Sequence, residues 1–409
     1  MRVLYVANGL THYYNLVLSR LNRERDVDLT VVVPAGTGGH IGQGVYQTRQ
    51  GVDFPVIELE ETRRFGLFST FKGLAGVLRR ERPDVIILIE CYLRAFLFEA
   101  SLVRARKKLH CKLILKSIPF RLLSYPDASQ AIEEGAPGFP RLSPWVNRLL
   151  LKTGCTRCLR RASLAVTRRV FCLPDAHVNY VEAHDTWASY GIPPEKIFVT
   201  RNSPDTELLF SVKESLSDLP PVLPHNPHRL LHVGRLVAWK RVDMLIRAFA
   251  RLRERFPRAE LLIIGVGPEE TALQKLARDL HLGATVIFLG GVYDPRLLGQ
   301  YYMASALYVL AGMGGLSINE AMCFGRPVLC SVCDGTEKVL VREDVNGRYF
   351  RDGDEDDLLE KITWFFDHPD QARQMGRRSV EIIRSEVNIH TVIEGYMNAL
   401  HFVNQQRIA

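Results

Sequence analysis

The sequence predicts an α/β protein made of two parallel sheets, each covered by helices. Three observations support this class. Short apolar, β-branched runs alternate with helical patterns through the first 120 residues, and the same alternation returns after residue 228. The segment between the two stretches, SVKESLSDLPPVLPHNPH, is polar and holds four prolines, as interdomain linkers do.

The first half is expected to alternate strands with helices in a sheet wound by right-handed crossovers. The strand-like runs are 2–8, 28–35, 84–90 and 112–118, and the helical patterns are about 13–23, 68–80 and 95–107. Residues 124–145 hold four prolines and show no periodicity, which predicts an irregular loop near a substrate cleft.

The second half repeats this organisation and ends in a helix. Its strand-like runs are 228–236, 259–267, 285–291, 306–312 and 327–332, and its helical patterns are about 242–256, 269–280, 295–303 and one that carries Glu320. We expect a first Rossmann-like domain over 1–215, a linker over 216–228, a second Rossmann-like domain over 229–385, and a C-terminal helix within 386–409 that crosses back to the first domain.

Composition narrows the class of protein. The chain has 409 residues, is 47% hydrophobic and 24% charged, and shows neither a long apolar span nor a signal-peptide pattern. A cytoplasmic location is therefore expected. Two CxxC pairs, Cys155 with Cys158 and Cys330 with Cys333, would suit a zinc site in principle, but they lie far apart in the chain, so no metal is expected.

The net charge of +8 is confined to the first half. Residues 1–220 hold 30 Lys/Arg and 22 Asp/Glu, and residues 104–169 alone hold 15 against three. Basic residues interleaved with apolar ones suit an anionic membrane surface or a polyanionic substrate. A solvated basic face on a core helix is the alternative. Nucleic acid is less favoured because aromatic residues are not interleaved at close spacing.

Two loops of the second half carry the chemistry. The run VGRLVAWKR places Gly234, Arg235 and Lys240 after a strand, where two cations beside a glycine suit a diphosphate. The alternative is that both cations are ordinary surface charges. The run AGMGGLSINEA places glycines before a helix start, whose N–H groups favour an anion.

Glu320 has two interpretations. Ser317 and Glu320 have the spacing of a capping box, which stabilises a helix start by about 1 kcal/mol. If Glu320 faces the cleft instead, its carboxylate would accept hydrogen bonds from sugar hydroxyls.

Taken together, these segments resemble the retaining, nucleotide-sugar-dependent glycosyltransferases of family 4 (glycosyl transferases group 1), which have the GT-B fold of two Rossmann-like domains facing across a cleft. The matching runs include HVGRLVAWKRVDMLIRAFARL, ELLIIGVGPEE, VIFLGGVYD and GGLSINEAMCFGRPVL. They occur in the family's order between residues 190 and about 365.

The resemblance implies a set of site residues. Arg235 and Lys240 would hold the donor diphosphate and act in catalysis, and Glu320 would bind the donor ribose. The donor-binding set is Gly9, Gly234, Arg235, Lys240, Gly265, Gly267, Val292, Met313, Gly314, Gly315, Leu316 and Glu320.

The chain departs from the family pattern in two places. The first glutamate of the E-x7-E motif, which contacts the donor sugar, is replaced by Gly312, and no histidine stands in LILKSIPFR, where the family often has one. Glu90 is the candidate catalytic residue of the first domain, with a structural role as the alternative. The expected acceptor residues are His40, Arg94 and Arg121, and Lys116 is a further candidate near a strand end.

The expected function is transfer of a hexosyl unit from a nucleotide diphosphate sugar to an acceptor hydroxyl with retention of configuration. It requires no cofactor beyond the co-substrate and no metal, because cations and a helix start stabilise the leaving diphosphate. The acceptor is expected to be a surface polysaccharide or lipid-linked glycan at the inner face of a membrane. The alternatives are a nucleotide-binding protein that has lost transfer and a GT-B-like phosphorylase or epimerase.

Overall fold

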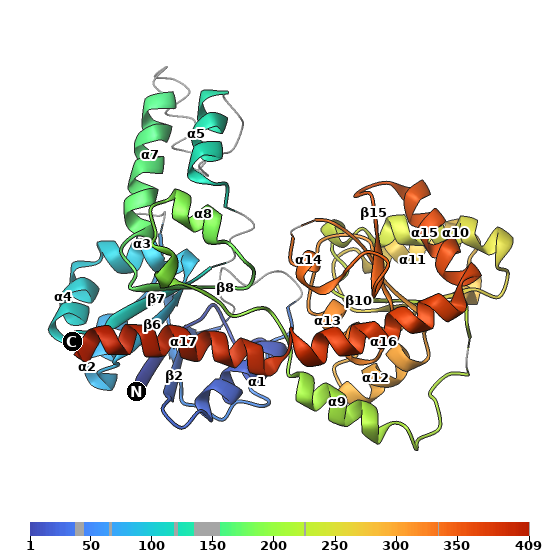
Figure 1. Ribbon diagram of the computed structural model, residues 1–409, viewed down its shortest axis with the longest axis horizontal. Helices are drawn as coiled ribbons and strands as arrows, with labels where there is room; N and C mark the ends of the chain where they lie inside the picture. The colour runs from blue at the N-terminus through green and yellow to red at the C-terminus, as the bar shows by residue number, and fades with distance from the viewer. Residues whose placement is uncertain are drawn as a thin grey trace. The chain divides into compact units, whose positions relative to one another are not determined.

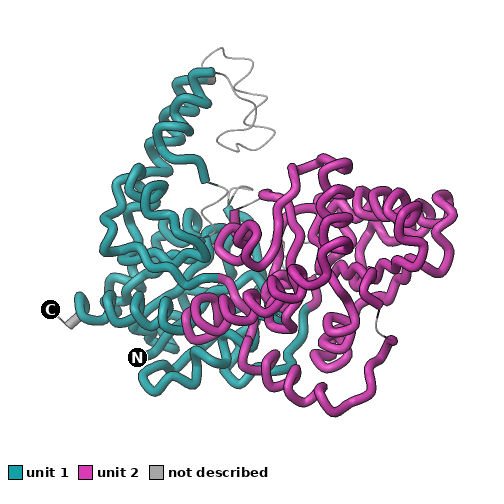
Figure 2. Tube along the Cα trace, turned by 45° about the vertical axis from the view of Figure 1, so that its right-hand side comes forward, with its two compact units in different colours: residues 1–41, 47–201, 392–409 teal, residues 42–46, 202–391 magenta. Residues whose placement is uncertain are grey.

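The computed structural model describes residues 1–36, 45–64, 68–117, 122–134, 156–224, 226–333 and 335–408. It divides into two compact units (Figure 2), and each unit has its own parallel sheet. Unit 1 comprises 1–41, 47–201 and 392–409, and unit 2 comprises 42–46 and 202–391. The predicted α/β class is confirmed.

Unit 1 is built on a seven-stranded parallel sheet in the order β3-β2-β1-β6-β7-β8-β9, beside a small antiparallel pair, β4-β5. The strands are β1 (Arg2–Val6), β2 (Asp28–Pro34), β3 (Val56–Leu59), β4 (Glu61–Arg64), β5 (Phe68–Phe71), β6 (Val85–Ile89), β7 (Lys112–Ser117), β8 (Ala176–Asn179) and β9 (Ile197–Val199). The strand order reverses between β1 and β6, so the loops after these two strands flank a topological switch point, where such sheets bind ligands.

Helices on both sides of this sheet bury its β-branched strands (Figure 1). They are α1 (His12–Asn22), α2 (Leu74–Glu81), α3 (Glu90–Phe98), α4 (Ala100–Lys108), α5 (Tyr125–Glu133), α7 (Thr156–Phe171), α8 (His184–Ser189) and the short η2 (Pro194–Lys196). The final helix, α17 (Ile389–Ile408), begins in unit 2 and belongs to unit 1 from Val392 onward.

Unit 2 holds a six-stranded parallel sheet in the order β12-β11-β10-β13-β14-β15. Its strands are β10 (Arg229–Val233), β11 (Glu260–Ile264), β12 (Val286–Phe288), β13 (Leu307–Leu310), β14 (Val328–Ser331) and β15 (Gly347–Phe350). Its helices are α9 (Thr206–Ser215), η3 (Ala238–Lys240), α10 (Val242–Arg255), α11 (Glu270–Asp279), η4 (Gly283–Thr285), α12 (Pro295–Met303), α13 (Ser317–Cys323), α14 (Glu337–Leu340), α15 (Glu355–Asp367) and α16 (Pro369–Ser385).

Successive strand residues of unit 2 enter two separate cores. Leu230 packs in one core with Leu245 of α10, whereas Leu231 packs in the other with Leu209 of α9. This alternation follows from the period of two along a strand whose two faces are both covered. It also moves the boundary between the units. The expected linker 216–228 lies within unit 2, because α9 already packs on the second sheet, and the units divide after Arg201.

Three local expectations for unit 1 differ from the structure. The helix expected over 68–80 is a strand, β5, followed by a helix that starts after Gly73, because residues 68–71 pair with β4. The helix expected over 95–107 is broken at Glu99, whose backbone is extended. The segment expected to be irregular begins as helix α5, capped by the Ser124 hydroxyl at the amide of Asp127; residues 135–145 lie outside the described part of the chain.

Candidate functional site

The site lies at the switch point of the second sheet, where β10 is flanked by β11 on one side and by β13 on the other. Lys240 ends the loop after β10, and its Nζ donates hydrogen bonds to the carbonyls of Met313 and Gly314 after β13, both at 2.7 Å. The Met313 amide donates back to the carbonyl of Trp239 at 3.0 Å. These hydrogen bonds join the loop of Arg235 and Lys240 to the glycine loop that precedes Glu320.

Glycines allow three loops to approach closely at this edge. Gly265 has φ +146°, and a Cβ there would lie 1.8 Å from the carbonyl oxygen of Gly234; a Cβ on Gly267 would lie 2.2 Å from that of Leu236. The Gly265 amide donates to the Gly290 carbonyl at 2.7 Å, which ties in the loop after β12. These glycines fix the edge of the site by backbone packing. Val292 follows Gly290 and Gly291 and is half-buried.

The two predicted diphosphate-binding cations have different surroundings. Lys240 is only 6% exposed, and its Nζ would lie 3.1 Å from a Cβ on Gly315. Arg235 is half-buried, and its guanidinium carbon lies 5.7 Å from the centre of the Trp239 ring. Lys240 therefore stabilises the glycine loop by hydrogen bonds to its carbonyls, whereas Arg235 lies beside the indole of Trp239.

Close packing requires a glycine at position 312. A Cβ at this position would lie 2.2 Å from the carbonyl oxygen of Trp239 and 2.9 Å from the Cα of Lys240. Real Cβ atoms do not approach backbone atoms so closely, so this conformation has no room for the family's first glutamate.

The predicted anion cradle is smaller than expected. The amide of Met313 is already bonded to Trp239, so it does not offer a donor to a ligand. Among the described residues, the structure records no partner for the amides of Gly314, Gly315 and Leu316. These three amides remain the predicted donors.

The capping-box interpretation of Ser317 and Glu320 is wrong. The N-cap of α13 is Leu316, and the Ser317 hydroxyl accepts a hydrogen bond from Tyr308 at 2.6 Å. The Glu320 carboxylate accepts one from the Tyr302 hydroxyl at 3.0 Å. Burial raises the pKa of Glu320 to about 7, and the bond from Tyr302 offsets part of this rise.

The residues predicted from the sequence did not include the buried polar side chains that neighbour Glu320 and Lys240. Tyr302 and Tyr308 are fully buried and are separated from Glu320 by 12 or more residues. His232 is buried on β10, with Nδ1 3.2 Å from the carbonyl oxygen of Val309. Burial, and then the neighbouring charge of Lys240, lower the pKa of His232 to about 4, so the ring is neutral. The one feature of the sequence that could have indicated these three residues is that each is a polar side chain within an apolar run.

The candidates of unit 1 lie in different environments. Gly9 lies in the loop after β1, and Glu90 is the exposed first residue of α3 directly after β6, so both occupy the switch point of the first sheet. Arg94 donates to the hydroxyl of Thr167 at 2.7 Å, and burial lowers its pKa from the usual value. His40 and Arg121 lie outside the described residues.

Lys116 is enclosed in the interior of unit 1. Its Nζ donates to the Tyr14 hydroxyl and lies 3.7 Å from the centre of that ring and 4.7 Å from that of Tyr180. Burial lowers its pKa well below the usual value. These contacts indicate that Lys116 stabilises the interior of unit 1.

Within the described ranges, no group of three or more His, Cys, Asp and Glu side chains is arranged to hold a metal ion, and no described helix is long and apolar enough to cross a membrane. Cys158 and Cys333 are exposed thiols and Cys330 is buried, while Cys155 lies outside the described residues.

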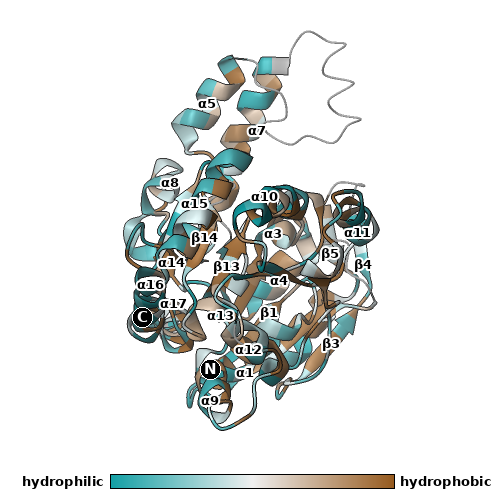
Figure 3. Cartoon of the chain, turned by 90° about the vertical axis from the view of Figure 1, so that its right-hand side faces the viewer, coloured by the Kyte–Doolittle hydropathy of each residue, from teal (hydrophilic) through white to brown (hydrophobic). Residues whose placement is uncertain are grey.

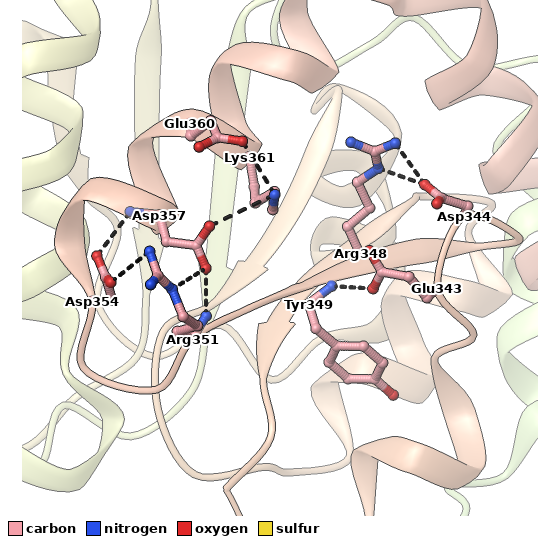
Figure 4. A network of polar contacts seen from close by, with 9 residues as sticks. All are labelled: Glu343, Asp344, Arg348, Tyr349, Arg351, Asp354, Asp357, Glu360 and Lys361. Carbon is pink, nitrogen blue, oxygen red and sulfur yellow. Dashed lines mark hydrogen bonds and ion pairs between the residues drawn. The ribbon is translucent and has the colours of Figure 1, made fainter.

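A separate polar network lies around β15 and the start of α15 (Figure 4). Arg351 pairs with Asp354 and Asp357, and Lys361 pairs with Asp357 and with Glu360. Because each cation in this network has carboxylate partners, we infer that the network stabilises the edge of the sheet at β15.

Comparison with known proteins shows what the second half of the chain is similar to. Residues 219–381 match the family model described as Glycosyl transferases group 1. This segment, which is less than half of the chain, is therefore similar to the glycosyl transferases of group 1. It contains the loops of Arg235, Lys240 and Glu320 described above.

Relatives of known sequence and structure agree with this similarity. The chain is 28% identical over 174 residues to an uncharacterized glycosyltransferase of Haemophilus influenzae, covering 42% of this chain and 48% of that protein. It is 27% identical over 233 residues to the D-inositol 3-phosphate glycosyltransferase of Kribbella flavida, covering 53% and 54%. The chain thus spans about half the length of the curated relatives it matches. The structure of HepE from Anabaena superposes with a TM-score of 0.67 at 18% identity, covering 98% of this chain and 100% of that one. The chain therefore has the GT-B fold.

Proposed function

We propose that the protein is a retaining glycosyltransferase that moves a hexosyl unit from a nucleotide diphosphate sugar to an acceptor hydroxyl. The observation that carries the proposal is that the loop of Arg235 and Lys240 after β10 and the glycine loop 314–316 after β13 lie at the switch point of the second sheet and are joined by the hydrogen bonds of Lys240. HepE, which shares the fold, was solved with UDP and with UDP-glucose. A nucleotide diphosphate suits the charge and the amide donors of this edge.

The mechanism follows from where charge develops. Negative charge grows on the leaving diphosphate as its bond to the anomeric carbon breaks, and the cations with the loop amides stabilise that charge more in the transition state than in the ground state. Glu320 accepts hydrogen bonds from the ribose hydroxyls. The sugar nucleotide is the co-substrate, and the cations take the place of a metal.

The first sheet supplies the acceptor side in this proposal. Glu90 and Gly9 lie in the loops that flank its switch point, where the reacting hydroxyl is expected. Glu90 is the proposed catalytic carboxylate of this unit. Arg94, His40 and Arg121 are the proposed acceptor contacts.

The first test is binding. Thermal shifts are measured with UDP, GDP, ADP and their sugar conjugates on the wild type, on Arg235→Ala and on Glu320→Ala, because a ligand that binds only the native state raises the midpoint. The matched control is Arg278→Ala, which removes an exposed arginine from α11. We expect one base to raise the wild-type and control midpoints and to leave those of the two site variants unchanged. No shift with any nucleotide would contradict the proposal.

A second test measures turnover with the nucleotide that binds. Arg235→Ala and Lys240→Ala are each expected to lower the rate by about 10²-fold, as loss of one oxyanion donor does. Gly312 favours the alternative of a nucleotide-binding protein that has lost transfer, because the family's sugar-contacting carboxylate has no room here. Binding of sugar nucleotides with no glycoside product would establish that non-catalytic alternative, and release of a sugar phosphate or an epimerised sugar would identify a phosphorylase or an epimerase.

We also propose that the acceptor is a polysaccharide or lipid-linked glycan reached at the cytoplasmic face of an anionic membrane. Helix α7 carries five arginines and no carboxylate, and Leu159 and Val166 on it are 44% and 47% exposed. Hydrophobic and hydrophilic segments alternate along this helix (Figure 3). Exposed apolar residues among arginines suit the headgroup region of a bilayer.

The membrane proposal is tested by sedimentation with phosphatidylglycerol vesicles. The wild type is expected to sediment at low salt and to be released at about 0.5 M salt, where screening is strong. The double variant Leu159→Ser/Val166→Ser should bind more weakly, whereas Leu280→Ser, at an exposed leucine of unit 2, should not. Equal binding by all three proteins, or no binding by the wild type, would exclude α7 as the contact.

A further inference from the structure

Trp239 is a large apolar side chain exposed within a polar site. It lies in η3, between the two predicted diphosphate-binding cations, and is 45% exposed. Lys240, the next residue, is buried, so the turn separates an inward cation from an outward indole. A single exposed tryptophan has no meaning by itself, but its position here is fixed by several contacts.

The backbone of Trp239 is held against the glycine loop. Its carbonyl accepts the Met313 amide at 3.0 Å and is the atom that excludes any side chain from Gly312. Its ring centre lies 5.7 Å from the guanidinium carbon of Arg235. The turn that excludes the family's carboxylate therefore presents an indole beside the cation expected to bind the diphosphate.

We propose that Trp239 is the platform on which the donor sugar ring stacks, in place of the carboxylate contact missing at Gly312. The inference rests on the proposed function, because it assumes a sugar nucleotide in this site. In such a donor the sugar is bonded directly to the second phosphate, so a group beside Arg235 is within reach of the ring. The C–H face of a pyranose is apolar, and an indole buries such a face over a large area.

The experiment separates the sugar from the nucleotide. Isothermal titration gives the Kd of UDP and of UDP-glucose, and in a second pair those of GDP and GDP-mannose, for the wild type, Trp239→Ala and Trp239→Phe. The matched control is Trp364→Phe, in helix α15 beside Arg348. We expect Trp239→Ala to weaken the bound sugar nucleotide by about tenfold, the size of one lost aromatic contact, and to change the Kd of its diphosphate by less than about twofold.

Trp239→Phe should recover most of the lost affinity, because it keeps an aromatic face, and the control should match the wild type. An unchanged Kd for the sugar nucleotide in Trp239→Ala would overturn the stacking role while leaving the proposed function intact. Equal losses for the diphosphate and the sugar nucleotide would show that Trp239 only shapes the turn, and would also overturn it. If the wild type binds neither pair, the proposed function fails and this inference fails with it.

Discussion

Gly312 shows how a single residue position is decided by packing. A missing family carboxylate suggests lost function, but the distances around Gly312 give a physical reason for glycine in this chain. The turn at Trp239 and Lys240 occupies the space that a side chain would need. Restoring the glutamate therefore means displacing the lysine turn.

We predict that Gly312→Glu destabilises the protein and does not raise its activity. Forcing a side chain against the Trp239 carbonyl should lower the free energy of unfolding by about 1–3 kcal/mol, as overpacking does. The measurement is urea unfolding. Gly76→Glu is the matched control, because a Cβ at Gly76 on α2 meets no atom within 4 Å. A stable Gly312→Glu variant with higher turnover would show that the loop opens readily.

Glu320 is expected to make stability depend on pH. Its pKa is about 7 in the folded protein, above the ordinary value of 4.5, so the folded state holds a proton that the unfolded state has lost between these values. Stability from this group is therefore full below pH 4.5 and is lost as pH rises through about 7. We predict that the free energy of unfolding of the wild type falls relative to Glu320→Gln between pH 5 and 8. A constant difference would show that the carboxylate is not desolvated.

Among the elements, α17 is attached to unit 1 by close contacts that the sequence pattern does not show. A Cβ on Gly395 would lie 2.4 Å from the Val199 carbonyl oxygen, so the helix rests directly on the end of β9. Tyr396 shares a hydrogen bond of 2.5 Å with Tyr14, whose hydroxyl also contacts Lys116. The helix thus covers a polar cluster inside the unit.

We predict that Tyr396→Phe lowers the free energy of unfolding by about 1 kcal/mol, the net value of one hydrogen bond. Thermal or urea unfolding measures the change. Tyr301→Phe serves as the control, because its hydroxyl makes no recorded hydrogen bond within the described part of the chain. Equal stability of the two variants would mean that the contact between Tyr14 and Tyr396 contributes nothing.

Across the described part of the whole molecule, each unit has one fully buried histidine. His177 lies in unit 1 beside Trp187, and His232 lies in unit 2. Burial is the first cause that lowers both pKa values, to about 4 from the ordinary 6.5. Each unit therefore contains an internal site that resists protonation.

We predict that acid destabilises both units through these rings. A folded pKa below the unfolded one gives stability that is present above pH 6.5 and is lost as pH falls through about 4. The slope of unfolding free energy against pH between these values should be smaller in His177→Phe and in His232→Phe, and smallest in the double variant. Identical slopes in all four proteins would refute the prediction, whatever their absolute stabilities.

Local patterns in the sequence predicted the order and type of most elements, because the periods of two and 3.6 are local properties of the chain. They also marked Arg235, Lys240 and the glycine loop after β13, because unusual residues at strand ends stand out without any contact information. Long-range packing, by contrast, places α9 in unit 2 and Lys116 inside a tyrosine cluster, and it gives Glu320 a hydrogen bond from Tyr302 in place of a capping box. These outcomes depend on packing between residues far apart in the sequence, which local pattern does not specify.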